Sequence, residues 1–92
     1  MVELPITEIA AERVRFVLSN TSHPGNIGSA ARAIRTMGFR RLCLVSPALF
    51  PHMDAHVLAA GADDVLEAAL QFDSLDAAIG DCSLVLGATA RL

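Results

Sequence analysis

Two short apolar runs separated by a helix-like segment constrain the fold of this chain most strongly. Residues 14–18 (VRFVL) and 41–45 (RLCLV) have the length and branched apolar character of buried strands. Between them, residues 26–37 have helical periodicity and end at a glycine, Gly38. A strand, a helix and a second strand in this order form a βαβ unit with parallel strands. The predicted fold class is therefore α/β, an open parallel sheet of βαβ units.

The rest of the chain continues the alternation of helices and strands. The expected elements are a helix over 54–61 with Asp54 as N-cap, a short helix capped by Asp73 or Ser74 and ended by Gly80, and a last strand over 83–87. Between the two helices, residues 65–72 (VLEAALQF) are compatible with helix or strand, and we expect a short strand near Leu70. Functional groups of open parallel sheets gather at the carboxyl ends of the strands. Three loops should therefore meet there, at residues 19–25, from Ser46 onward, and at 87–92.

The length of 92 residues predicts one small domain. No apolar run approaches the ~18 residues that a membrane span needs. The amino-terminal stretch carries acids rather than the basic end of a secretory signal. We expect a cytoplasmic protein without a membrane partner, with a leader over residues 1–13 and a domain over 14–92.

Charge is unevenly distributed along the sequence. The net charge of −3 taken alone argues against a nucleic-acid partner. Residues 13–53, however, contain six arginines and no acid, whereas residues 54–92 contain seven acids and only Arg91. A segregated basic face can attract a polyanion although the total charge is negative. A solvated face whose charges average out would produce the same composition.

Cysteines and histidines do not indicate a metal centre. Cys43 and Cys82 lie in or beside apolar runs, and without an export signal they are expected to be reduced. His52 and His56 are one helical turn apart, but two histidines are too few ligands for a structural metal site, and surface positions are the simpler interpretation. We therefore predict that no metal is bound.

The first helix has two stripes with different chemistry. Ile27, Ala30, Ala31, Ile34 and Met37 follow the spacing of a face that packs on the sheet. The other stripe holds Gly28, Ser29, Arg32, Arg35 and Thr36. Because helical side chains lean toward the amino terminus, Arg32 should lie over Gly28 and Ser29, with room beside its guanidinium. The helix start adds free N–H groups, so an anion or an electron-rich oxygen is one candidate ligand.

Plain packing explains the same pattern nearly as well. Glycines at a helix start often serve close packing on a sheet, and exposed arginines are common. Gly25-x-x-Gly28-x-Ala30 is also loosely similar to a dinucleotide-binding fingerprint, but it lacks the Gly-x-Gly turn, and the chain has no P-loop lysine.

The stretch NTSHPGNIGSAARAIRTMGF, beginning at Asn20, closely resembles the first signature motif of the SpoU/TrmH class of SPOUT RNA methyltransferases. The similarity continues through LVSP, AAGADDVL and DCSLVLGATAR, so it covers residues 14–92. It implies a Rossmann-like first half of a SPOUT α/β-knot domain. It also implies transfer of a methyl group from S-adenosyl-L-methionine (SAM) to a ribose 2′-hydroxyl in the anticodon loop of a tRNA, by a homodimer.

The resemblance also assigns roles to individual residues. Arg32 matches the arginine that acts on the 2′-hydroxyl, and Asn26 matches the asparagine ahead of it. Ser22 and His23 would face the RNA, and Arg35 is either a phosphate contact or a structural residue. The remaining match is the SAM-contacting loop, which corresponds to Ala88, Thr89 and Ala90. A hydroxyl residue is expected where Ala88 stands.

The sequence stops before the two further motifs that complete the SAM site in this class, so the knot segment is absent. We therefore expect the chain alone to bind SAM poorly and to be inactive. Two other functions are compatible with the residues: a non-enzymatic RNA-binding or assembly module derived from this fold, and an unrelated nucleotide-binding half-domain.

Overall fold

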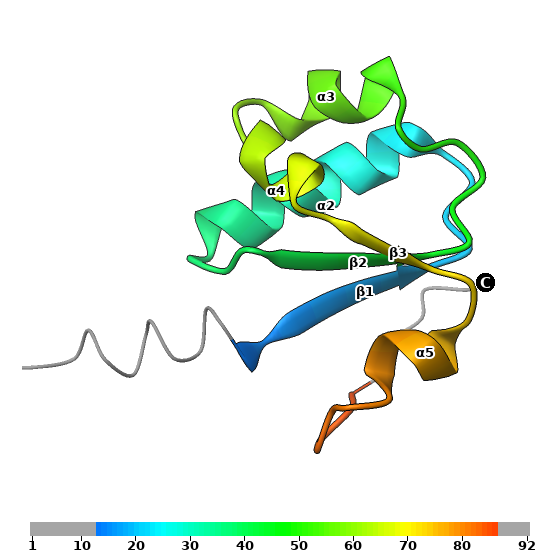
Figure 1. The fold of residues 1–92 in the computed structure, drawn as a ribbon. Coiled ribbons are helices and arrows are strands. Elements are labelled where there is room, and N and C mark those ends of the chain that lie inside the picture. The colour runs from blue at the N-terminus through cyan, green and yellow to red at the C-terminus, as the bar shows by residue number, and fades with distance from the viewer. Residues whose placement is uncertain (1–12, 87–92) are drawn as a thin grey trace, which may run out of the picture.

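The computed structural model describes residues 13–86. Seven elements follow one another along the chain (Figure 1): β1 (Arg15–Ser19), α2 (Pro24–Thr36), β2 (Arg41–Val45), α3 (Met53–Ala59), α4 (Asp63–Glu67), β3 (Leu70–Phe72) and α5 (Leu75–Ile79). The strands form one parallel sheet in the order β1-β2-β3. Helices α2 and α4 cover one face, α3 lies on α2, and α5 lies on the opposite face (Figure 1). The predicted open parallel α/β sheet is confirmed.

The strand register brings the functional edge of the sheet together. Arg15 pairs with Arg41 and Ser19 with Val45, so β1 and β2 end level with each other. β3 is shorter: it begins with Leu70 opposite Cys43 and ends with Phe72 opposite Val45. All three carboxyl ends therefore lie at one edge, where parallel sheets position their ligands.

The core lies between the sheet and the first helical layer. Its buried side chains come from α2, β2, α3 and α4 and include Ile27, Ala31, Ile34, Leu42, Leu44, Val65 and Leu66. Phe16 and Phe39 extend it at one side, with ring centroids 5.3 Å apart. Cys43 is buried and reduced as predicted, and its burial raises the pKa of the thiol. Cys82 is also a free thiol but is only half-buried.

Three local predictions were wrong. His52, not Asp54, caps α3: its imidazole accepts from the Asp54 N–H at 3.0 Å, because His52 is extended and Asp54 already lies in the first turn. Met37 is 56% exposed because it follows α2 rather than continuing the buried stripe. Residues 65–72, left open between helix and strand, divide between the end of helix α4 and the expected short strand β3. Gly28 does not lie on the open stripe of α2, as described below.

The predicted last strand is also wrong as far as the structure describes it. Residues 83–86 form no strand, and Gly87 lies outside the described residues. Leu84 and Leu86 are 77% and 87% exposed. Alternating apolar residues favour a strand only when a neighbouring strand and a covering layer bury them, and neither contacts this stretch closely enough to do so.

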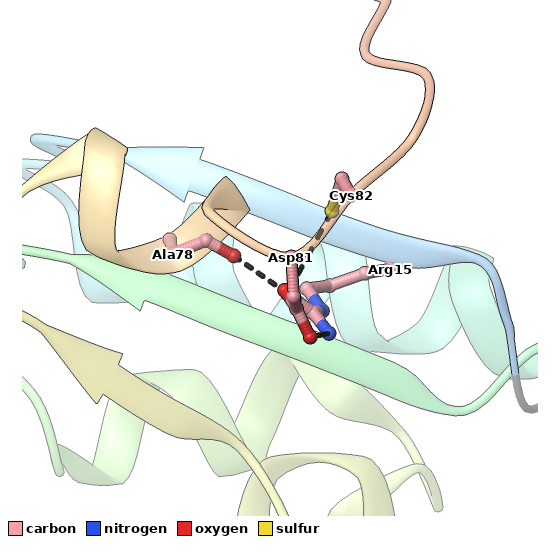
Figure 2. Close-up of polar contacts among 4 residues, drawn as sticks. All are labelled: Arg15, Ala78, Asp81 and Cys82. Atoms are coloured by element: carbon pink, nitrogen blue, oxygen red, sulfur yellow. Dashed lines mark hydrogen bonds and ion pairs between the residues drawn. The ribbon is translucent and has the colours of Figure 1, made fainter.

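One arginine ties the second face of the sheet together (Figure 2). Arg15 on β1 donates through Nη1 to the Ala78 carbonyl of α5 at 2.7 Å and to Asp81 Oδ1 at 2.8 Å. Its Nη2 reaches the other carboxylate oxygen of Asp81 at 3.2 Å. The Arg15 side chain is only 16% exposed, so this bidentate pair fixes α5 and the residues after it against β1.

We expect the pair of Arg15 with Asp81 to make the stability of the fold depend on pH. The hydrogen bonds from Arg15 hold the pKa of the Asp81 carboxyl below its usual value. The charged carboxylate therefore stabilises the fold above the usual pKa of aspartic acid, about 4, and the contribution is lost as the pH falls through the lowered pKa of the folded state. Asp81→Asn should lower the thermal unfolding midpoint at pH 7, modestly because Asp81 is exposed. The difference from wild type should shrink as the pH falls below about 4; a difference that is the same at pH 7 and at pH 2 would contradict this account.

Candidate functional site

The loops at the carboxyl edge are joined by backbone hydrogen bonds. After β1, the N–H of Asn20 donates to the Val45 carbonyl at 2.8 Å. After β2, the N–H of Ser46 donates to the Phe72 carbonyl at 3.0 Å, and that of Ala48 to the Thr21 carbonyl at 3.0 Å. The predicted meeting of the first two loops is confirmed. The third loop predicted here, residues 87–92, lies outside the described residues.

Two residues of this edge adopt left-handed backbone conformations. Asn20 has φ 57° and Ser46 has φ 47°, backbone angles that residues other than glycine rarely adopt. Each is the first residue after its strand, and the N–H of each still donates to a carbonyl of the neighbouring strand. The hydroxyl of Ser46 also donates to the Asp73 carbonyl at 3.2 Å, so the end of β3 is included. Residues in such strained conformations persist where the surrounding hydrogen bonds and packing hold the backbone in place, and they concentrate at functional sites.

Helix α2 begins directly beside these loops without a side-chain cap. His23 occupies the N-cap position, but no side chain caps the helix, and its first turn contains no acid. Pro24 at the start is buried and lacks an N–H, and the Asn26 N–H bonds the His23 carbonyl at 3.0 Å. The predicted site residues Ser22, His23 and Asn26 are all exposed here. The arrangement suits an anionic or electron-rich oxygen.

Arg32 is exposed on the same helix, as predicted. Its side chain makes no hydrogen bond or ion pair with any residue in 13–86; only its carbonyl is engaged, by the Thr36 hydroxyl at 2.8 Å. Asn26 and Arg32 do not share one face, since six residues place them about 120° apart and about 9 Å along the axis. Arg32 therefore leaves its guanidinium available to a ligand at the side of the helix, not directly at its first turn.

Arg35 is engaged by an acid that sequence reasoning missed. Its Nη1 pairs with the carboxylate of Asp64 on α4. Asp64 is 29 residues further along the chain, so no local pattern could reveal the pair. Both side chains are more than half exposed, and such pairs contribute little to stability. The role of Arg35 in RNA binding stays a prediction, with its guanidinium shared with Asp64.

Gly28 serves packing rather than a ligand. A Cβ built on it would lie 2.0 Å from the Ala55 carbonyl oxygen and 3.0 Å from the Ala59 nitrogen. Helix α3 therefore crosses α2 with backbone against backbone at this residue. The prediction that Gly28 leaves room beside Arg32 was wrong, because α3 occupies that space.

Histidines and acids in residues 13–86 form no group of three or more potential metal ligands. His56 pairs with Asp63 at 2.7 Å, and His52 is occupied in capping α3. No helix in the described part of the chain is long and apolar enough to cross a membrane. The predicted cofactor residues Ala88, Thr89 and Ala90 lie outside that part.

Comparison with known proteins places the chain among RNA methylases. The model of the SpoU rRNA Methylase family matches residues 13–91. A tRNA (cytidine/uridine/adenosine-2′-O-)-methyltransferase TrmJ of Pseudomonas aeruginosa is 56% identical over 80 residues, which are 87% of this chain and 31% of that protein. An uncharacterized tRNA/rRNA methyltransferase of Haemophilus influenzae is 53% identical over 81 residues, 88% of this chain and 33% of that protein.

Solved structures agree with the fold. A probable methylase family protein from Haemophilus influenzae superposes with a TM-score of 0.81 at 52% identity, covering 87% of this chain and 34% of that one. TrmJ from Z. mobilis superposes with a TM-score of 0.73 at 34% identity, covering 82% and 37%. The chain thus spans about a third of the length of the proteins it matches.

Proposed function

Because the chain belongs to the SpoU rRNA methylase family, we propose that it forms part of an RNA methyltransferase that modifies a ribose 2′-hydroxyl of tRNA. The name of the Pseudomonas aeruginosa relative states this activity for that protein. The observation that carries the proposal for this chain is Arg32: an exposed guanidinium without a partner in residues 13–86, on the helix that starts at the carboxyl edge of the sheet.

The proposed role of Arg32 follows from the chemistry of guanidinium. It stays protonated in proteins, so it does not take the proton of the 2′-hydroxyl. It instead positions the ribose and stabilises the negative charge that develops on the 2′-oxygen, while a neighbouring RNA phosphate takes the proton. When bound, SAM supplies a methyl group on a positively charged sulfur. Asn26 orients the substrate from the first turn of α2.

The remaining assignments belong to the same proposal. Ser22 and His23 contact the RNA from the loop before α2, and Arg35 adds a phosphate contact. Ala88, Thr89 and Ala90 form part of the SAM site. The rest of that site comes from a region of the relatives that this chain does not cover, and the working enzyme is a cytoplasmic homodimer.

The test is a graft. This chain replaces the matching segment of the Pseudomonas aeruginosa relative, with which it shares 56% identity, and the product is called the grafted enzyme. We expect it to transfer labelled methyl groups from SAM to tRNA, producing linkages that resist alkaline hydrolysis. The relative carrying its own segment is the positive control, and the relative without that segment should be inactive. A grafted protein that binds tRNA but transfers nothing would favour the non-enzymatic RNA-binding module.

A further inference from the structure

A groove opens at the amino edge of the sheet, opposite the loops of the proposed active site. It has a volume of about 380 Å³ and lies between the first half of β2 and helix α4. It exists because β3 begins at Leu70, opposite Cys43, so β2 runs further toward this edge than β3 does. Helix α4 forms the other wall through Val65 and Ala68.

The lining of the groove combines cations with apolar surface. Arg40 and Arg41 lie at one end, and Leu42, Val65, Ala68 and Leu70 provide the apolar part. Leu70 is 51% exposed although it is a large apolar side chain. Asp64 also lines the groove, but its carboxylate is paired with Arg35, so it opposes an incoming anion less than a lone acid would.

This combination matches the two parts of a nucleotide. A volume of a few hundred Å³ is the usual size for a small-ligand pocket. Arginines bind phosphate groups of nucleic acids without reading sequence, and apolar side chains can cover the face of an unpaired base and remove it from water. A purely anionic ligand would leave the apolar part uncovered, and a purely apolar one would bury the guanidinium groups.

We propose that this groove binds one nucleotide of single-stranded RNA, with its base on Ala68 and Leu70 and its phosphate against Arg40 and Arg41. The inference rests on the proposed function, since the RNA substrate is the source of the nucleotide. The two ends of β2 are about 13 Å apart at the usual rise of a strand. The groove therefore holds a nucleotide other than the one whose ribose reacts, and it fixes the path of the RNA across the sheet.

The test uses the 92-residue chain and the backbone amide signals of its NMR spectrum, titrated with penta-uridylate. We expect the signals of Leu42, Val65 and Leu70 to shift. Ala68→Leu, which narrows the groove without adding an aromatic ring, should weaken binding about tenfold, the loss expected when about 60 Å² of apolar contact with the base is excluded. Ala77→Leu is the matched control, because Ala77 is an exposed alanine on α5 at the other face; it should bind as wild type does.

A second pair of variants tests the charge. Arg40→Gln should weaken penta-uridylate binding about tenfold, as expected for one charge-assisted hydrogen bond. Arg13→Gln removes the same charge from an exposed residue that does not line the groove, and it should change the affinity less than about twofold. Circular dichroism establishes that all four variants are folded.

Three outcomes would overturn the inference. Shifts confined to residues 22–26 and Arg32 would place the RNA at the proposed active site alone and leave the proposed function standing. Equal binding of inorganic phosphate and penta-uridylate would reduce the groove to an anion site. Absence of any shift would remove the groove as an RNA site, whereas the proposed function is decided separately by methyl transfer in the grafted enzyme.

Discussion

Gly28→Ala is expected to destabilise the chain by about 2–3 kcal/mol, as overpacking of a tight contact does. The new methyl carbon would lie 2.0 Å from the Ala55 carbonyl oxygen, and that atom belongs to backbone. Backbone of α3 cannot rotate away as a side chain can, so the two helices must separate. Alanine favours a helix over glycine by up to about 1 kcal/mol, which offsets only part of this cost. Urea unfolding followed by circular dichroism measures the change.

Gly25→Ala is the matched control on the same helix. A Cβ at Gly25 would meet Leu58 Cδ1 at 2.8 Å, the far end of a flexible side chain. Leu58 is 48% exposed and can adopt another rotamer, so the expected loss is below about 1 kcal/mol. Equal stability of the Gly28 variant and wild type would show that α3 can shift on α2 without cost.

Arg32→Ala is expected to lower kcat of the grafted enzyme by about 10²–10³, the usual effect of removing one donor that stabilises an oxyanion. Stability should change little, because the side chain is exposed and has no partner in the described part of the chain. Arg32→Lys keeps the charge but not the forked geometry, and it should recover only part of the rate. Single-turnover methyl transfer to tRNA separates this step from product release.

Arg35→Ala is the comparison for that result. It removes the pair with Asp64, and if Arg35 contacts a phosphate it should raise KM for tRNA more than it lowers kcat. A fall in kcat equal to that of Arg32→Ala would contradict the separate roles proposed here. An unchanged rate for Arg32→Ala would remove Arg32 from the mechanism.

The fold was predictable where local pattern and tertiary packing agree. The strand Arg41–Val45 was located to the residue because both of its faces are buried, which leaves a continuous apolar run. Helix α2 begins two residues earlier than predicted, because Pro24 is suited to a first helical position although it has no N–H. The short helix Asp63–Glu67 is held by burial of Val65 and Leu66 rather than by a signal of its own, so its sequence alone was ambiguous.

The candidate site was predictable only along one helix. Helical period correctly placed Arg32 on the exposed side, since that needs only the apolar positions around it. The pair of Arg35 with Asp64 and the groove at the amino edge both bring residues 35–43 to residues 64–70, and this proximity depends on how α4 packs on α2 and β2. Gly28 was misjudged because the approach of α3 to α2 is likewise a property of the assembled fold.

The hydrogen bond between Ala48 and Thr21 limits how far the two loops of the proposed active site can differ in length among related sequences. Because the loop after β2 is held to the loop after β1 at 3.0 Å, a residue inserted into either loop would displace the other and the start of α2 with it. The two loops are therefore expected to keep their lengths together among related sequences, so that new substrate preferences arise by exchanging side chains on them. Insertions should be better tolerated at the turn between α2 and β2, where Gly38 has open space around it.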